Sequence, residues 1–244
     1  MKTWALASFT LRETVRSRTM IIGLVVSFLY LAIVPVLSSS SGGSAVVGDA
    51  ELKTAAGRDF LSFALGGLNF IGMSMAIFTT LGAIFTEVEK GTILSLITKP
   101  IHRWQLVLGK WAGHTLLMGG YVLIMGLVLW ITVCLGSGAI IWPFIPAIAL
   151  VALNVITMVS LTLFFSTFLP VIANAIFVFL LFIFTSNLRV INAIGQTSDN
   201  MIVVGISHVL RLLLPVSEVS DLANLVLMGK SRAAELTGTE TAAF

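Results

Sequence analysis

From Trp111 to Leu188 the chain reads WAGHTLLMGGYVLIMGLVLWITVCLGSGAIIWPFIPAIALVALNVITMVSLTLFFSTFLPVIANAIFVFLLFIFTSNL, without one Asp, Glu, Lys or Arg. A helix needs only about 20 apolar residues to cross the hydrocarbon core of a bilayer, so a single helix cannot account for this stretch. Turn-forming residues divide it at two places, one marked by Gly136–Gly138 with Pro143 and Pro146 and the other by Leu169–Pro170. The sequence therefore predicts three membrane spans, over about residues 112–135, 145–168 and 171–188.

Composition places the whole chain in the same class. It is 57% hydrophobic and 10% charged, with a mean hydropathy of +1.05. A soluble domain carries about 25% charged residues. The apolar runs are continuous, which argues against the alternating pattern of a transmembrane β-barrel. We expect an all-α integral membrane protein, a helical bundle of five spans in which residues 20–37 and 60–85 supply the first two.

The first 19 residues have the pattern of a helix that lies in the membrane interface. Apolar side chains recur at helical spacing, and arginines flank that stripe one turn apart. The alternative is a solvated leader whose arginines only set the orientation of the chain. The stripe consists of Trp4, Ala7, Leu11 and Val15, and the flanking residues are Arg12 and Arg16.

The tail differs from the spans. Residues 201–214 are apolar but interrupted by His208 and Arg211, which is typical of an interfacial or re-entrant helix. Residues 221–228 are a second short candidate, so we expect outer helices within 201–228. Residues 231–244 are small and polar, and we expect a flexible tail after a transmembrane domain over residues 20–230.

The distribution of basic residues predicts the orientation. Segments 1–19 and 86–110 hold four each, whereas the intervening segment 38–59 holds only two. Because basic residues are retained on the cytoplasmic side, the N-terminus and segment 86–110 are predicted to be cytoplasmic, in a multi-pass protein of the inner or plasma membrane. The basic residues of the two segments are Lys2, Arg12, Arg16, Arg18, Lys90, Lys99, Arg103 and Lys110.

The charged loop between the second and third spans reads EVEKGTILSLITKPIHRWQLVLGK from Glu87 to Lys110. Thr92 can cap a short helix, Leu94 and Leu96 give that helix an apolar surface, and Pro100 ends it. A short apolar helix on the cytoplasmic side suits docking of a soluble partner. The same features also fit a well-capped interfacial loop.

Residues 89–110 resemble the cytoplasmic loop of ABC transporter permeases of the type 2 (exporter) class. In that class an acidic residue, Gly-Thr, a leucine-rich turn, a Pro, a basic residue and Gly-Lys recur in this order. The leader resembles the interfacial elbow helix of the same class. The resemblance implies a homodimeric membrane subunit whose loop docks on a separate cytoplasmic ATPase. The expected coupling residues are Glu87, Glu89, Gly91, Thr92, Leu94, Leu96, Pro100 and Arg103.

The resemblance has further implications. ATP and Mg are expected on the partner subunit, with no cofactor bound by this chain. Within the class, the leader and loop look most like the permease of the nitrous-oxide-reductase maturation transporter. Such permeases usually have six spans, whereas no sixth apolar run follows residue 228. We expect either a truncated chain or a natural five-span chain whose C-terminus lies outside.

The sequence offers no catalytic or nucleotide-binding motif of its own. Gly229-Lys230-Ser231 imitates the end of a phosphate loop, but Asn224 stands where that motif requires its first Gly. The histidines are far apart and no paired acid and base can be named, so we predict neither an enzyme nor a metal site. Met73 and Met75 could bind a soft metal, although Met more commonly packs between helices.

Polar residues inside the spans are candidates for lining a transport path. Asn69, Met73 and Thr80 form one stripe of the second span, and Asn154 and Thr157 share a face of the fourth. Ordinary interhelical hydrogen bonding is the alternative reading. No charged residue lies in mid-span, which argues against an ion-coupled carrier.

The sequence thus predicts the permease subunit of an ATP-driven ABC exporter. Two alternatives remain open. One is a secondary carrier, and the other is a membrane assembly or anchoring protein that transports nothing. The substrate is not defined by these residues.

Overall fold

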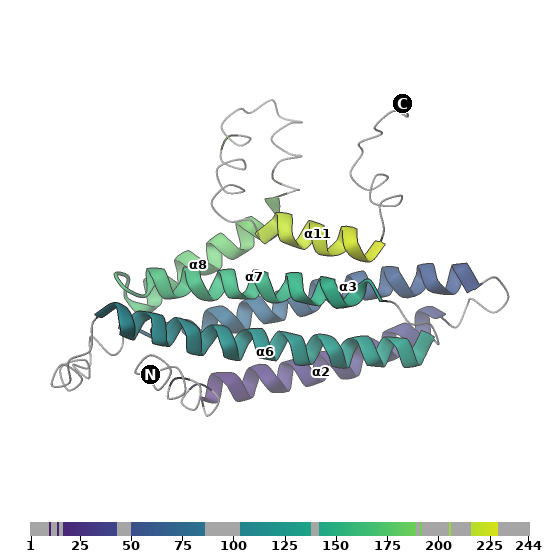
Figure 1. Cartoon of the computed structure of the whole chain (residues 1–244), viewed down its shortest axis with the longest axis horizontal. Helices are drawn as coiled ribbons and strands as arrows, with labels where there is room; N and C mark the ends of the chain where they lie inside the picture. Colours follow the sequence, from purple (N-terminus) through teal and green to yellow (C-terminus); the bar gives the residue numbers. More distant parts are fainter. Residues whose placement is uncertain are drawn as a thin grey trace.

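A computed structural model of the chain is all-helical over the residues that it describes (Figure 1). These are Thr10, Thr14, residues 17–42, 50–85, 103–137 and 142–188, Ile191, Gly205 and residues 216–228. The side chains of residues 34–42, 50–60 and 136–137 and of Arg103, Ser217, Leu227 and Met228 are not among the described parts. The helices are α2 (Arg18–Gly42), α3 (Ala50–Thr80), α6 (Arg103–Ser137), α7 (Phe144–Phe165), α8 (Val171–Ser186) and α11 (Val216–Met228).

Helices long and apolar enough to cross a membrane confirm the predicted fold class. Leu61–Thr80, Trp104–Leu135 and Phe144–Phe165 meet this criterion, and Arg18–Ile33 and Val171–Ser186 are shorter apolar segments. Each of the five predicted spans therefore overlaps one helix of an all-α membrane protein. Most of the leader, the predicted helix 201–214 and the tail 231–244 fall outside the described residues.

The predicted loop 38–59 is wrong over most of its length. α2 continues through Pro35 to Gly42, and α3 already begins at Ala50. Proline is tolerated within a membrane helix, and Ala, Glu, Leu, Lys and Arg, which dominate residues 50–59, are good helix formers in water. The charges of that segment mark where the hydrocarbon region ends and do not mark the end of the helix.

Two other predicted boundaries also move. α6 begins at Arg103, so the last third of the predicted 86–110 loop is helical. α11 begins at Val216, directly after Pro215, and not at Asp221. Proline fixes the backbone before the first helical turn and cannot interrupt it there, which explains the earlier start.

Contacts along α2 and α3 show that these helices are antiparallel. The thioether of Met75 packs against Gly23, whereas the hydroxyl of Tyr30 donates to the carbonyl of Ala64 at 2.9 Å. As the numbers rise on α2 they fall on α3. The contact of Lys110 with the carbonyl of Ala83 places the end of α3 and the start of α6 at the same end of the bundle. We call this end the loop end, because residues 86–102 connect the two helices in the sequence. We call the opposite end the far end.

α7 runs antiparallel to α6 and parallel to α3. At the loop end the indole N–H of Trp111 donates to Ser160 Oγ at 2.8 Å. Towards the far end, Gly126 lies so close to α7 that a Cβ built on it would be 2.6 Å from Cγ2 of Ile148. Small residues permit such close approach of membrane helices.

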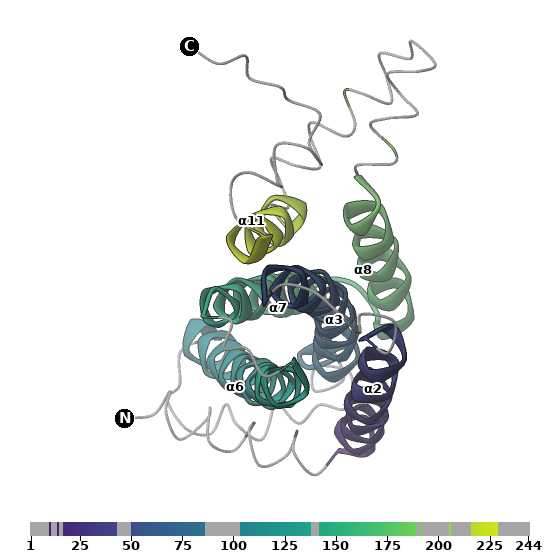
Figure 2. The same ribbon diagram turned by 90° about the vertical axis from the view of Figure 1, so that its right-hand side faces the viewer.

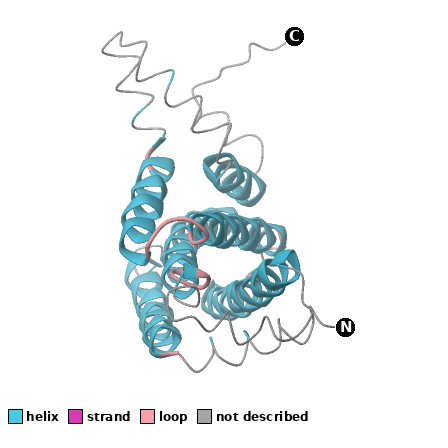
Figure 3. Ribbon diagram, turned by 90° about the vertical axis from the view of Figure 1, so that its left-hand side faces the viewer, coloured by secondary structure: helices cyan, strands magenta, loops and turns pink. Residues whose placement is uncertain are grey.

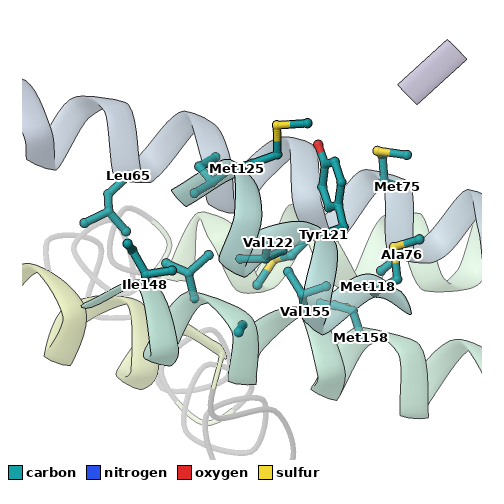
Figure 4. Packing of buried hydrophobic residues seen from close by; sticks show 14 of the residues in the cluster. Leu65, Met75, Ala76, Met118, Tyr121, Val122, Met125, Ile148, Val155 and Met158 are labelled. Atoms are coloured by element: carbon teal, nitrogen blue, oxygen red, sulfur yellow. The ribbon is translucent and has the colours of Figure 1, made fainter. Parts of the chain in front are cut away.

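The core lies between α3, α6 and α7, whose apolar side chains interdigitate (Figure 4). Within it, Met118, Val155 and Met158 are fully buried. α2 packs against one side of this group, and α11 packs along α7 and α3 on another, as the end-on views show (Figures 2 and 3). Much of α2 and α8 remains apolar and exposed, with Ile22 and Ile172 as examples, which suits lipid or a second subunit.

Candidate functional site

The end of α3 is held to α7 by one buried hydroxyl group. Ser166 follows the last residue of α7 and is fully buried. Its Oγ accepts hydrogen bonds from the backbone N–H groups of Ile84 at 3.2 Å and Phe85 at 3.5 Å. Its own N–H donates to the carbonyl of Thr162 at 3.0 Å, which fixes its position on α7. The backbone that leaves α3 is therefore attached to α7.

The same turn is held to α6 by a lysine. The ammonium group of Lys110 donates a hydrogen bond to the carbonyl of Ala83. Gly82 has a φ of 73°, a left-handed conformation that favours glycine and that lets the chain turn here. Like Ser166, Lys110 thus contacts the backbone of this turn. We call Lys110, Ser166 and the backbone of residues 83–85 the root clamp.

The root clamp lies where the charged loop meets the bundle. Residues 86–102 leave the clamp directly after Phe85 and return as α6 at Arg103, two turns before Lys110. The clamp also reaches α8, because the carbonyl of Thr162 accepts a hydrogen bond from Asn174 Nδ2 at 3.2 Å. A displacement of the loop would therefore act on four helices at once.

A second polar group of residues lies halfway along the bundle. Ser220 of α11 accepts hydrogen bonds from the amide groups of Asn154 of α7, at 2.9 Å, and Asn69 of α3, at 3.4 Å. The Ser220 hydroxyl itself donates to the carbonyl of Val216 at 2.8 Å. Asn69 and Asn154 lie near the middle of the apolar segments of α3 and α7. We call Asn69, Asn154 and Ser220 the mid-bundle node.

The direction of α11 follows from a second contact. Ser62 Oγ lies 3.5 Å from Asn224 Oδ1. Asn224 is one turn after Ser220 on α11, whereas Ser62 is two turns before Asn69 on α3. α11 therefore runs from the middle of the bundle towards the far end, antiparallel to α3. The predicted outer helix is in contact with the spans over the far half of their length.

Comparison with known proteins places this arrangement in a family. A family model described as ABC-2 family transporter protein matches residues 4–244. The chain belongs to the ABC-2 transporter family. Among curated proteins, no match was found. The family assignment confirms the resemblance carried by residues 89–110 and establishes a membrane permease with a role in transport.

Most of the predicted coupling residues of this ABC-2 permease lie outside the described residues. Arg103 is the first residue of α6, and its side chain also lies outside the described part. The coupling role of these residues stays a prediction. The undescribed positions are Glu87, Glu89, Gly91, Thr92, Leu94, Leu96 and Pro100.

The predicted path residues of the permease fall into different environments. Asn69 and Asn154 meet at Ser220. Met73 and Thr80 are fully buried. Thr157 is half-buried and donates to the carbonyl of Leu153 at 2.9 Å, within its own helix, and it does not take part in the node.

Ser166 and Ser220 were missed by the sequence analysis. The partners of Ser166 are backbone groups, which carry no sequence signal. For Ser220, one signal was present, because Ser220 and Asn224 are one turn apart and share a face of the helix. Lys110 was part of the Gly-Lys motif, but its contact with Ala83 depends on the tertiary fold.

The described part of the permease contains few charged side chains and no cluster of metal-binding residues. Its charged side chains are Arg18, Lys110, Glu218 and Asp221. No group of three or more His, Cys, Asp or Glu side chains in this part could hold a metal ion. Met73 and Met75, two residues apart on α3, point about 200° apart around the helix and so cannot bind one ion together.

Proposed function

We propose that this ABC-2 permease is the membrane subunit of an ATP-driven exporter and that residues 86–102 dock on a separate cytoplasmic ATPase. The family assignment supports the permease role. The root clamp is the observation that carries the proposal further. It attaches the near root of the loop to α6 and α7 through Lys110 and Ser166. A docking loop needs such an attachment if it is to transmit force into the membrane.

In the proposed mechanism ATP, with Mg, binds the partner, and its hydrolysis changes the distance between two docked loops of a permease dimer. Movement of the loop displaces residues 83–85 together with the start of α6 and the end of α7. Packed helices have few alternative arrangements, so a small displacement at the clamp would select between two states of the bundle. The chain itself supplies the path and the coupling, and the partner supplies the chemistry.

Orientation and assembly belong to the same proposal. The loop end faces the cytoplasm of the inner or plasma membrane, in agreement with the basic residues of segments 1–19 and 86–110. Two copies form a homodimer. The exposed apolar surfaces of α2 and α8, which include Phe28 and Ile176, provide area for a second copy and for lipid.

Replacing Glu87 and Glu89 with alanine tests the docking. We expect the partner's ATPase rate, measured in the purified complex in lipid, to lose its dependence on the permease, with a decrease of about fivefold or more if the coupling is worth about 1 kcal/mol. Glu51→Ala is the matched control, because Glu51 belongs to the first turn of α3, at the far end of the bundle.

An unchanged ATPase rate in the Glu87→Ala, Glu89→Ala variant would contradict the docking role. Transport that survives depletion of ATP but stops when the ion gradient is removed would favour the secondary carrier. A stable complex that neither stimulates ATP hydrolysis nor transports would favour an anchoring protein.

A further inference from the structure

We propose that the mid-bundle node is a contact site for a polar, uncharged group of the transported substrate and that α11 is the element that covers it. The proposal rests on the proposed export function. It is carried by hydrogen-bonding groups of the node that have no partner among the described residues.

Each amide of the node is only half satisfied. Oδ1 of Asn69 and Oδ1 of Asn154 are buried and accept no hydrogen bond among the described residues, and the Asn154 side chain is only 1% exposed. Exchanging Oδ1 and Nδ2 of either amide leaves one polar group unpaired as before, because Nδ2 then loses its hydrogen bond with Ser220. Two polar groups thus stay unpaired within the described part of the bundle in every assignment of the amides.

Such an arrangement is a poor way to hold helices together. A buried polar group without a partner costs free energy, and a half-satisfied network is less favourable than an apolar core. Leucine at positions 69 and 154 would pack α3 and α7 without that cost. Unpaired polar groups at the middle of the spans are therefore more readily explained by contact with a substrate during transport.

The chemistry of the node indicates the kind of group. Amides and a hydroxyl donate and accept hydrogen bonds without carrying charge. Glu218 and Asp221 lie on the same helix as Ser220, and the described side chains of α3, α7 and α11 include no Lys, Arg or His. Among the described side chains of these three helices, an anion would therefore find acidic residues and no countercharge. A hydroxyl or amide group of a substrate fits the node.

α11 is placed to open and close the node. It begins near the middle of the bundle, and its Ser220 and Asn224 make polar contacts with α3 and α7. A shift of α11 that breaks the contacts of Ser220 frees both amides at once. The node would then be reached from the far end, along the groove that α11 leaves.

Chemical labelling of a thiol introduced at position 220 tests the access. The Ser220→Cys variant is made in a Cys134→Ala background, since Cys134 is the native cysteine. The permease–ATPase complex is reconstituted in vesicles and treated with hydroxyethyl methanethiosulfonate, which is uncharged, or with the anionic sulfonatoethyl reagent. We expect ATP turnover to raise the neutral labelling rate at least about tenfold, and the anionic reagent to react at least about tenfold more slowly.

Ser186→Cys in the same background is the control, because residue 186 is exposed on α8 and its labelling should not depend on ATP. If the Ser220→Cys variant stays unreactive during turnover while the Ser186→Cys variant is labelled, the node is dry packing and the proposal is overturned. Equal rates with both reagents would overturn the assignment to an uncharged group.

A second measurement tests the node without any ATPase. If the permease stimulated no ATPase, the proposed function would be contradicted, but the proposal for the node would still stand or fall by this measurement. We expect the Asn69→Leu, Asn154→Leu variant to unfold in detergent at the same temperature as the wild type or above it. A decrease of several degrees would show that the amides serve as structural hydrogen bonds, and the substrate site would then be excluded.

Discussion

Ser166→Ala is expected to uncouple the permease from its ATPase while leaving the two proteins bound. The variant removes the hydroxyl that accepts from the N–H groups of Ile84 and Phe85, so the backbone at the root of the loop loses its attachment to α7. Lys110→Met removes the second attachment, to Ala83. If the clamp carries a coupling free energy of about 1–3 kcal/mol, permease-dependent ATP hydrolysis should decrease by about 5–150-fold.

The control for the clamp is Ser160→Ala. Ser160 lies on α7 and accepts a hydrogen bond from Trp111 of α6, so the variant loses an interhelical bond of the same kind without affecting residues 83–85. ATPase rates, co-purification of the partner and unfolding temperature are measured for all variants. Equal losses of ATPase rate in Ser160→Ala and Ser166→Ala would contradict a specific role for the clamp.

Two glycines of α6 are expected to respond to alanine in opposite directions. A Cβ at Gly126 would lie 2.6 Å from Cγ2 and 2.9 Å from Cγ1 of Ile148, whose branched side chain has little freedom to move away. Gly126→Ala should therefore push α6 and α7 apart and destabilise the fold by about 1–3 kcal/mol. The effect is measured as the unfolding temperature in detergent or as the denaturant midpoint in mixed micelles.

Gly120→Ala is the matched control. Nothing lies within 4 Å of a Cβ built at this position, so the substitution only replaces glycine by the better helix former, which is worth about 0.5–1 kcal/mol. The two variants lie on one helix and should shift stability to opposite sides of the wild type. Equal stability of both would contradict the close packing of α6 on α7.

The sequence predicted the helices better than their ends. Each of the five predicted spans overlaps a helix, because a bilayer leaves a spanning chain little choice but helical structure. The ends moved because a helix does not stop where the hydrocarbon stops. α3 begins at Ala50, well before its apolar segment, and α6 begins at Arg103 in the predicted loop.

Two residues of the candidate site could be predicted from the sequence. Asn69 and Asn154 are conspicuous because an amide is rare in an apolar run, and the structure brings them together at Ser220. Ser166 could not be found, since it contacts the backbone of residues distant in sequence. Contacts of that kind depend on which helices are neighbours, and hydrophobic periodicity does not contain that information.

The most direct test of the central claim is to purify the full-length protein from its native membrane in mild detergent and identify what accompanies it. The account predicts a soluble ATPase in stoichiometric amount, which is lost when residues 87–103 are replaced by a Gly/Ser sequence of equal length and retained in Ser166→Ala. A stable, monodisperse permease that brings no ATPase would contradict the account.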